Sequence, residues 1–232
     1  MISLDDSERL VRSPLGSALV VGSFIAAGER LLAYQRQRAE LGPGYWVAVG
    51  EAGTGKRALL EIWCRLHRAR GRVVALDCAR LDPEELSEAI AQGGSPALGL
   101  SPGDVPLLLS PQRLPARTQD ELAELDRRLF LSFQALPERL SPALRRRFGG
   151  VHLLPALREV PDEIAIYFER LLGLLSPGEP PTLDPSAVGA LRRHPWPGNF
   201  RELRHVAQRL LLGGAGPVVR AEELHFDGGM VH

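Results

Sequence analysis

Apolar residues in the first two thirds of the chain come in short runs, separated by stretches where apolar residues recur at helical spacing. The short runs predict five strands, at 46–49, 73–76, 107–109, 130–133 and 151–154. The spaced stretches predict helices at 25–41, 59–66, 83–91 and 116–129. Strands that alternate with helices are typical of a parallel sheet covered on both faces, which binds its ligands at the carboxyl ends of the strands.

The pattern changes at Pro161, after which it indicates helices only. One helix is expected from Pro161 to Leu175. A second begins after Asp184 as its cap, with Pro185 in the first turn. A third begins at Asn199, which is again expected to cap it, and runs to about residue 212.

Two domains follow from this change of pattern. The first is an α/β domain over residues 1–160, whose first 16 residues are expected to form a loose arm. The second is a small all-α domain over residues 161–232. A chain of 232 residues is long enough to bury an α/β core and add a small second domain.

A glycine-rich segment follows the first predicted strand and precedes a predicted helix. Its spacing, G-x-x-x-x-G-K, is typical of a phosphate-binding loop. Glycines let backbone N–H groups converge on phosphate oxygens, and the Lys56 ammonium reaches the β- and γ-phosphates. A plain glycine turn is the alternative. The residues expected to bind the nucleotide are Gly50, Glu51, Ala52, Gly53, Thr54, Gly55, Lys56 and Arg57.

Two features of the composition bear on this loop. The 28 basic residues include a single lysine, Lys56, and the chain has a single asparagine, Asn199. Chance survival of these residues is one interpretation, but arginine substitutes poorly for a compact ammonium in a phosphate loop, which favours a chemical need for Lys56. Arg57 stands where a Ser or Thr normally contacts magnesium. The loop and Lys56 indicate ATP or ADP as the cofactor. Because of Arg57, a need for Mg²⁺ is doubtful.

Charge and cysteine content narrow the class of protein. The formal net charge is zero, so nothing attracts the chain generally to nucleic acid or acidic membranes. The two cysteines and six histidines lack metal-ligand spacing, and we expect no metal site from them. Acidic residues occupy the N-terminus where a signal peptide would be basic, and the longest apolar stretch, 17–28, is too short to span a bilayer. We expect a cytoplasmic protein without membrane contact.

Three segments resemble the sigma-54-dependent transcriptional activators, which are bacterial enhancer-binding proteins. Residues 49–56 are similar to their G-E-S-G-T-G-K loop, residues 196–203 to their W-P-G-N-x-R-E-L sensor II helix, and residues 155–159 to their P-P-L-R-E. A Pro-Gly turn with a buried Trp196 is the alternative for the second segment. The resemblance, which covers residues 20–226, implies a P-loop AAA+ fold: a parallel five-stranded sheet flanked by helices, followed by a small all-α lid domain.

The resemblance also implies roles for three residues. Arg201 matches the sensor II arginine, which reaches from the lid to the bound phosphates. Gln134 takes the place of the sensor I asparagine and is able to orient a water molecule. Arg147 aligns with an arginine finger that completes the site of a neighbouring subunit. A solvated basic patch over 145–147 is the alternative to the finger.

Several parts of the family's machinery are missing. Its Walker B strand ends in Asp and Glu, which organise magnesium and activate water, whereas the aligned residues here are Leu109 and Ser110. The G-A-F-T-G-A loop that grips sigma-54 is absent between residues 86 and 106, and we expect the helix-turn-helix that follows the lid in the family to be missing as well. We therefore expect impaired or absent ATP hydrolysis, no contact with sigma-54 and no direct DNA binding.

Three functions stay open on the sequence. The favoured one is a nucleotide-binding regulatory or scaffolding subunit related to transcription, which self-associates as a nucleotide-dependent oligomer or ring and acts on an unknown protein partner. The second is a working ATPase that remodels a different protein and takes its metal acid from Asp77 or Asp104. The third is an interaction domain without nucleotide. Lys56 and Arg201 favour the first two, and the residues at the Walker B positions favour the first.

Overall fold

The computed structural model describes residues 44–60, 71–127 and 129–226. The arm expected over 1–16, the helix expected over 25–41 and Cys64 lie outside this part of the chain. Within it, no helix is both long and apolar enough to cross a lipid bilayer. The strands are β1 (Tyr45–Val49), β2 (Val73–Asp77), β3 (Val105–Leu109), β4 (Phe130–Phe133), β5 (Phe148–Leu153), β6 (Thr182–Leu183) and β7 (Val218–Val219). The helices are α4 (Pro83–Gln92), α5 (Ala116–Glu124), α6 (Pro142–Arg146), α7 (Ile164–Leu175), α8 (Pro185–Arg193) and α9 (Asn199–Leu212).

The chain divides into two compact units, which are described separately. The first, called the sheet unit, contains β1 to β5 and helices α4 to α6. The second, called the lid unit, combines residues 155–226 with residues 52–58 of the glycine loop. The loop thus belongs to the same compact unit as the C-terminal helices, although about 100 residues separate them in sequence.

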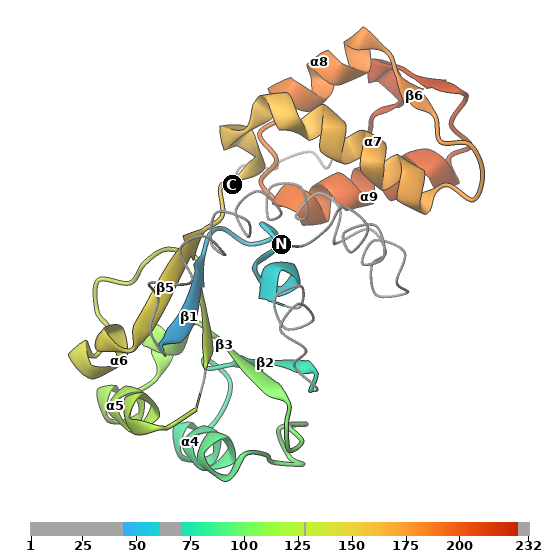
Figure 1. The fold of residues 1–232 in the computed structure, drawn as a ribbon. Helices are drawn as coiled ribbons and strands as arrows, with labels where there is room; N and C mark the ends of the chain where they lie inside the picture. The colour runs from blue at the N-terminus through green and yellow to red at the C-terminus, as the bar shows by residue number, and fades with distance from the viewer. Residues whose placement is uncertain (1–43, 61–70, 128, 227–232) are drawn as a thin grey trace, which may run out of the picture. The chain divides into compact units, whose positions relative to one another are not determined.

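The sheet has five parallel strands in the order β2-β3-β4-β1-β5 (Figure 1). This confirms the predicted five-stranded parallel sheet. β1 pairs with β4 on one side and β5 on the other, so the strand that leads into the glycine loop is internal. All five predicted strands are present, each shifted or extended by no more than three residues at either end.

One face of the sheet packs against α4, α5 and α6, and this packing follows from the alternation of side chains along the strands. Tyr45, Val47 and Val49 of β1 are buried on this face, as period-two alternation requires. They share a core cluster with Leu86 of α4 and Leu122 of α5. Burial of such side chains stabilises the unit by roughly 1.5–3 kcal/mol each.

Local signals set the ends of these helices. Asp82 caps α4 by accepting hydrogen bonds from the backbone N–H groups of Glu84 and Glu85, at 3.0 and 2.9 Å. The helix ends at Gly93, whose φ of 87° is accessible to glycine at little cost. α5 ends at Glu124, five residues before the predicted end, because Leu125 adopts an extended conformation.

The lid unit is built from α7, α8 and α9 around a core of its own (Figure 1). Trp196 is fully buried there, and its indole N–H donates a 2.8 Å hydrogen bond to the Leu191 carbonyl oxygen. Asp184 caps α8 as predicted, by accepting from the N–H of Ser186 at 2.8 Å. Two short strands, β6 and β7, also pair in parallel; the hydrophobic pattern did not indicate them.

The expectation that Asn199 caps α9 is wrong. Asn199 is the first residue of the helix, Gly198 precedes it, and no side chain caps this end. The Asn199 side chain instead accepts a hydrogen bond from the backbone N–H of Leu157, at 2.8 Å. Its φ of 50° lies in the left-handed region, which asparagine tolerates better than most residues.

Candidate functional site

The glycine loop leaves the carboxyl end of β1 and turns sharply into a helix. The N–H of Gly50 donates to the Phe133 carbonyl oxygen at 3.1 Å, which fixes the start of the loop on β4. Gly53 and Gly55 have φ angles of 81° and 89°, where residues with a side chain are strained. A helix then begins at Lys56 and continues to the end of this described range at Leu60. Successive N–H groups in such a turn form a concave anion site.

Two carbonyl groups of the loop are hydrogen-bonded to the start of α9, within the lid unit. The Ala52 carbonyl oxygen accepts from the Asn199 side-chain amide at 3.0 Å. The Gly53 carbonyl oxygen accepts from the backbone N–H of Phe200 at 3.1 Å. A Cβ on Gly53 would lie 2.1 Å from the Gly198 carbonyl oxygen, so only glycine fits at this position.

The turn that presents these groups is Trp196-Pro197-Gly198-Asn199. It is closed by a 2.9 Å hydrogen bond from the N–H of Asn199 to the Trp196 carbonyl oxygen. The buried carboxylate of Glu202 accepts from the N–H of Gly198 at 2.8 Å and contacts the His194 ring. These bonds hold the turn within the lid unit and fix the beginning of α9.

Arg201, the expected sensor II residue, is exposed in the first turn of this helix. It is one residue beyond Phe200, whose N–H contacts the loop. Arg201 therefore belongs to the helix end that contacts the glycine loop. Lys56 is partly buried and Arg57 is exposed at the loop's own end.

The carboxyl edge of the sheet brings together three predicted positions. Gly50 follows β1, Ser110 follows β3, and Gln134 follows β4, which lies between them. The N–H of Ser110 donates to the Ser132 carbonyl oxygen at 2.9 Å, and Ser110 has a φ of 54°. Gln134 is exposed. Leu109 is the last residue of β3, so this strand ends without a carboxylate.

Comparison with known proteins identifies the architecture. A family model described as an AAA+ ATPase lid domain matches residues 158–227. NtrX from Brucella abortus, solved in complex with ATP, superposes with a TM-score of 0.63 at 22% identity, covering 85% of this chain and 52% of that one. The chain has the AAA+ fold.

Two curated relatives come from Escherichia coli K12. The regulatory protein AtoC is 28% identical over 75% of this chain and 46% of its own length. UacR, whose name describes a uric acid sigma-54-dependent transcriptional regulator, is 29% identical over 73% of this chain and 35% of its own length. The chain is therefore similar to sigma-54-dependent regulators and spans less than half the length of these relatives.

Asp77, one alternative metal acid, lies at the carboxyl edge of the AAA+ sheet but on its outermost strand. β2 is three strands away from β1, about 14 Å at the usual strand spacing. The Asp77 carboxylate accepts from the N–H of Ala79 at 3.1 Å and forms a 3.3 Å ion pair with Arg80. Asp77 thus shapes the turn after β2.

Asp104, the other alternative metal acid, is placed wrongly for that role. It precedes β3, so it lies at the amino edge of the sheet, whereas the glycine loop leaves the carboxyl edge. A five-residue strand separates the two edges by about 16 Å. The Asp104 side chain, only 6% exposed, accepts from the N–H groups of Arg72 and Ser101, at 2.9 and 3.1 Å.

Arg147, the expected arginine finger, makes two contacts within the sheet unit. Its guanidinium carbon lies 4.9 Å from the centroid of the Tyr45 ring, and Nη2 donates to the Leu125 carbonyl oxygen at 3.0 Å. Because Tyr45 begins β1, this arginine also lies at the amino edge of the sheet. These contacts engage the partly buried Arg147 near the start of β1, and its role towards a neighbouring subunit stays a prediction.

The residue that sequence reasoning underestimated is Asn199. It was expected only to cap a helix, yet it connects the loop to the turn at Leu157. Its status as the sole asparagine was a usable signal, because a unique amide at a motif position suggests a need for both a donor and an acceptor.

We predict that Asp104→Asn lowers the stability of the fold by about 1 kcal/mol at neutral pH, without changing nucleotide affinity. The N–H groups of Arg72 and Ser101 hold the pKa of Asp104 below its ordinary value. Its stabilising contribution is therefore present above about pH 4 and is lost as the pH falls through the folded-state pKa. Unfolding in urea across pH 3–7 should show the two proteins converging at low pH.

Glu88→Gln, which removes an exposed carboxylate from α4, is the matched control for net charge. A difference between Asp104→Asn and the parent chain that stays constant down to pH 3 would contradict the assigned role. So would a loss of nucleotide affinity in Asp104→Asn.

Proposed function

We propose that this chain is a transcription-related AAA+ regulatory protein that binds ATP or ADP through residues 50–57 and hydrolyses it slowly or not at all. The observation that carries the proposal is the glycine loop itself. Its two positive-φ glycines and its lysine follow an internal strand, and its outward carbonyls are bound by a lid helix. This arrangement fits the phosphates of a nucleotide, because it leaves consecutive N–H groups to converge on an anion.

Each predicted residue has a place in this proposal. The N–H groups of the loop and the ammonium of Lys56 would hold the phosphates, and Arg201 would add charge from the first turn of α9. Gln134 would contribute a neutral amide at the carboxyl edge of the sheet. NtrX was solved with ATP and, in a second structure with a TM-score of 0.61 and 20% identity, with ADP. These neighbours support nucleotide binding by this chain.

Slow or absent hydrolysis is supported by the end of β3. Hydrolysis needs a carboxylate to hold a metal ion or to accept a proton from water. Leu109 and Ser110 supply neither, and Asp104 lies at the other edge of the sheet. The bound nucleotide would then act as a ligand that shifts the population of conformations, rather than as a substrate whose hydrolysis supplies free energy.

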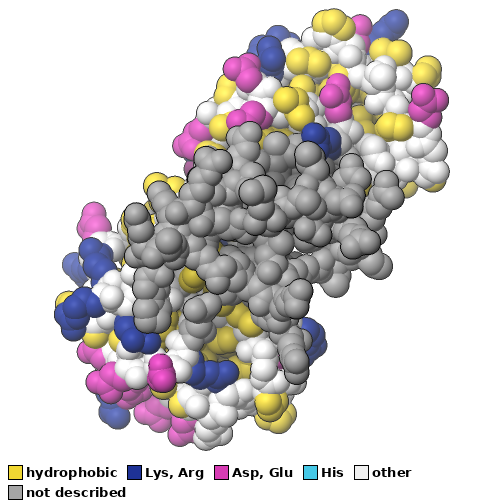
Figure 2. All heavy atoms as spheres, in the orientation of Figure 1, with side chains coloured by type: hydrophobic (Ala, Val, Ile, Leu, Met, Phe, Trp, Pro, Cys, Tyr) yellow, Lys and Arg dark blue, Asp and Glu magenta, His cyan; other side chains and the backbone are white. Residues whose placement is uncertain are grey.

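The partner is proposed to be a protein other than sigma-54. The connection from α4 to β3 is short: Ser95 and Leu100 pair with each other through hydrogen bonds of 2.7 and 3.0 Å. This compact turn replaces the long contact loop of the family. Arginines and acidic residues are interspersed over the visible surface of the sheet unit, which supports the expectation of no direct DNA binding (Figure 2). Capture of sigma-54 by the nucleotide-loaded chain would overturn this choice of partner.

Nucleotide binding should depend on Lys56. We expect measurable affinity for ATP or ADP that falls at least roughly tenfold in Lys56→Ala, because a charge-assisted contact to phosphate is lost. Isothermal titration with and without Mg²⁺ measures this. Arg139→Ala, which removes an exposed cation outside the loop, is the matched control and should bind as the parent chain does. No binding at millimolar nucleotide would leave an interaction domain as the function.

Turnover should be negligible on the same samples. A rate on the order of 1 per second is typical of enzymes, and we expect release of phosphate far below it, because β3 ends without a carboxylate. A Mg²⁺-dependent rate of that size which disappears in Lys56→Ala would establish an active AAA+ ATPase. Asp77→Asn would then test whether the acid at the carboxyl edge of β2 supplies the activity.

Self-association should respond to nucleotide. If ATP binds the assembled state better than the monomer, ATP shifts the equilibrium towards oligomer. Sedimentation velocity with and without ATP should show larger species in the parent chain and no ATP effect in Lys56→Ala. Arg147→Ala should weaken this shift while leaving nucleotide binding largely intact, and Arg146→Ala, which removes an exposed arginine of α6, is its matched control. A monomer under all conditions would favour a monomeric regulator.

A further inference from the structure

The two hydrogen bonds from α9 to the loop orient two N–H groups as well as the carbonyl groups that they contact. A trans peptide unit is planar, and its C=O and N–H groups point in opposite directions. The described residues contain no cis peptide bond. When the Ala52 carbonyl oxygen is fixed towards Asn199, the N–H of Gly53 therefore points away from the lid turn. The bond from Phe200 to the Gly53 carbonyl oxygen orients the N–H of Thr54 in the same way.

The side chain of Asn199 has the donor and the acceptor that this position requires. Its side-chain oxygen accepts from the N–H of Leu157 at 2.8 Å, while its side-chain nitrogen donates to the Ala52 carbonyl oxygen at 3.0 Å. The residue is fully buried, so neither bond is exchanged for a bond to bulk water. A primary amide offers a donor and an acceptor on two separate atoms, so it can bridge two backbone groups that lie apart. Aspartate would place a carboxylate against the Ala52 carbonyl oxygen.

The backbone conformation of Asn199 also contributes to these contacts with the loop. Its φ of 50° turns the chain so that the side chain reaches Ala52 while the next N–H, that of Phe200, reaches Gly53. Glycine could adopt the same φ but would supply no side-chain bonds. The Gly198 carbonyl oxygen lies so close to Gly53 that a side chain at residue 53 would collide with it.

We propose that Asn199 is a positioning residue for nucleotide binding, which acts by orienting the phosphate-facing N–H groups of Gly53 and Thr54. This inference rests on the proposed nucleotide-binding function and adds a mechanism to it. Asn199 does not touch the phosphates. It orients the N–H groups of Gly53 and Thr54 before the nucleotide binds, so binding does not have to order the loop. Because the same amide holds Leu157, nucleotide affinity and the packing of the lid turn are linked.

The two bonds of Asn199 can be separated by substitution. Asn199→Asp keeps an acceptor for the N–H of Leu157 but loses the donor to Ala52. Asn199→Gly keeps access to the left-handed conformation and loses both bonds. Leu210→Ala is the matched control, because it weakens the lid core in the last turn of α9, about 16 Å from Asn199 along the helix.

The experiment measures ATP and ADP affinity by titration and amide hydrogen exchange by NMR in each variant. We expect Asn199→Asp to lower nucleotide affinity by roughly tenfold or more, the size of one buried hydrogen bond. Protection of the Leu157 amide should remain, and that of the Phe200 amide should fall because the loop is released. Asn199→Gly should lose protection at both amides and bind at least as weakly. Leu210→Ala should melt at a lower temperature and bind as the parent chain does.

The outcomes separate this inference from the proposed function. If the parent chain binds neither ATP nor ADP, the proposed function fails, and the inference fails with it. If the parent chain binds and Asn199→Asp binds equally well, the inference alone is overturned. It is also overturned if Leu210→Ala weakens binding as much as Asn199→Asp does, because general loosening of the lid would then explain the effect. Lys56→Ala should lose affinity while the amides of Leu157 and Phe200 stay protected.

Discussion

The planarity of two peptide units in the glycine loop is the constraint on which the candidate site depends. Each unit has its oxygen bound by the first turn of α9, so each has its N–H directed away from that turn. Gly53 permits this because it has no side chain and adopts a positive φ. The proposed binding of phosphate by the loop would therefore depend jointly on the loop sequence and on a lid turn that begins over 140 residues later.

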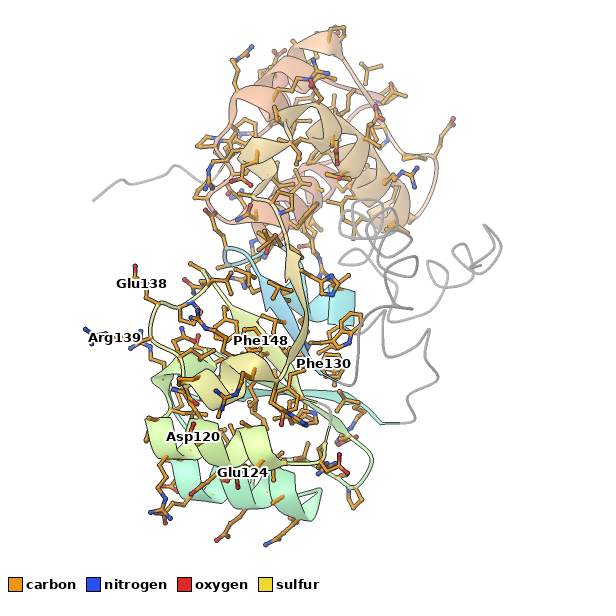
Figure 3. All side chains as sticks on the ribbon, turned by 60° about the vertical axis from the view of Figure 1, so that its left-hand side comes forward. Asp120, Glu124, Phe130, Glu138, Arg139 and Phe148 are labelled. Atoms are coloured by element: carbon orange, nitrogen blue, oxygen red, sulfur yellow. The ribbon has the colours of Figure 1, made fainter. Side chains whose placement is uncertain are left out.

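The sheet separates the predicted residues by the edge at which they lie. Gly50, Ser110 and Gln134 meet at the carboxyl edge, where ligands of parallel sheets bind. Asp104 and Arg147 lie at the amino edge, and both are engaged in hydrogen bonds within the sheet unit. Exposed charges of the sheet unit include Glu138 and Arg139, which point outward from the connection between β4 and α6 (Figure 3). Charge on that connection is thus available to a partner.

Much of the fold could be predicted from sequence, because strands buried in a parallel sheet are continuous apolar runs and glycine loops have fixed spacing. The contacts of Arg147 could not, because position along the chain does not say which partners a guanidinium will find. Tyr45 and Leu125, its partners, are 102 and 22 residues away. The strands β6 and β7 have two residues each, too few to show a period. The double role of Asn199 depends on Ala52, 147 residues away, so no local pattern encodes it.

The contact between Gly53 and the Gly198 carbonyl oxygen has an evolutionary consequence. A methyl group on Gly53 would have to displace a backbone oxygen that lies 2.1 Å away, and that oxygen belongs to the turn held by Glu202. A chain that gained a side chain at residue 53 would therefore also need a different lid turn. Residue 53 and the lid turn are therefore under a shared steric constraint despite their distance in sequence.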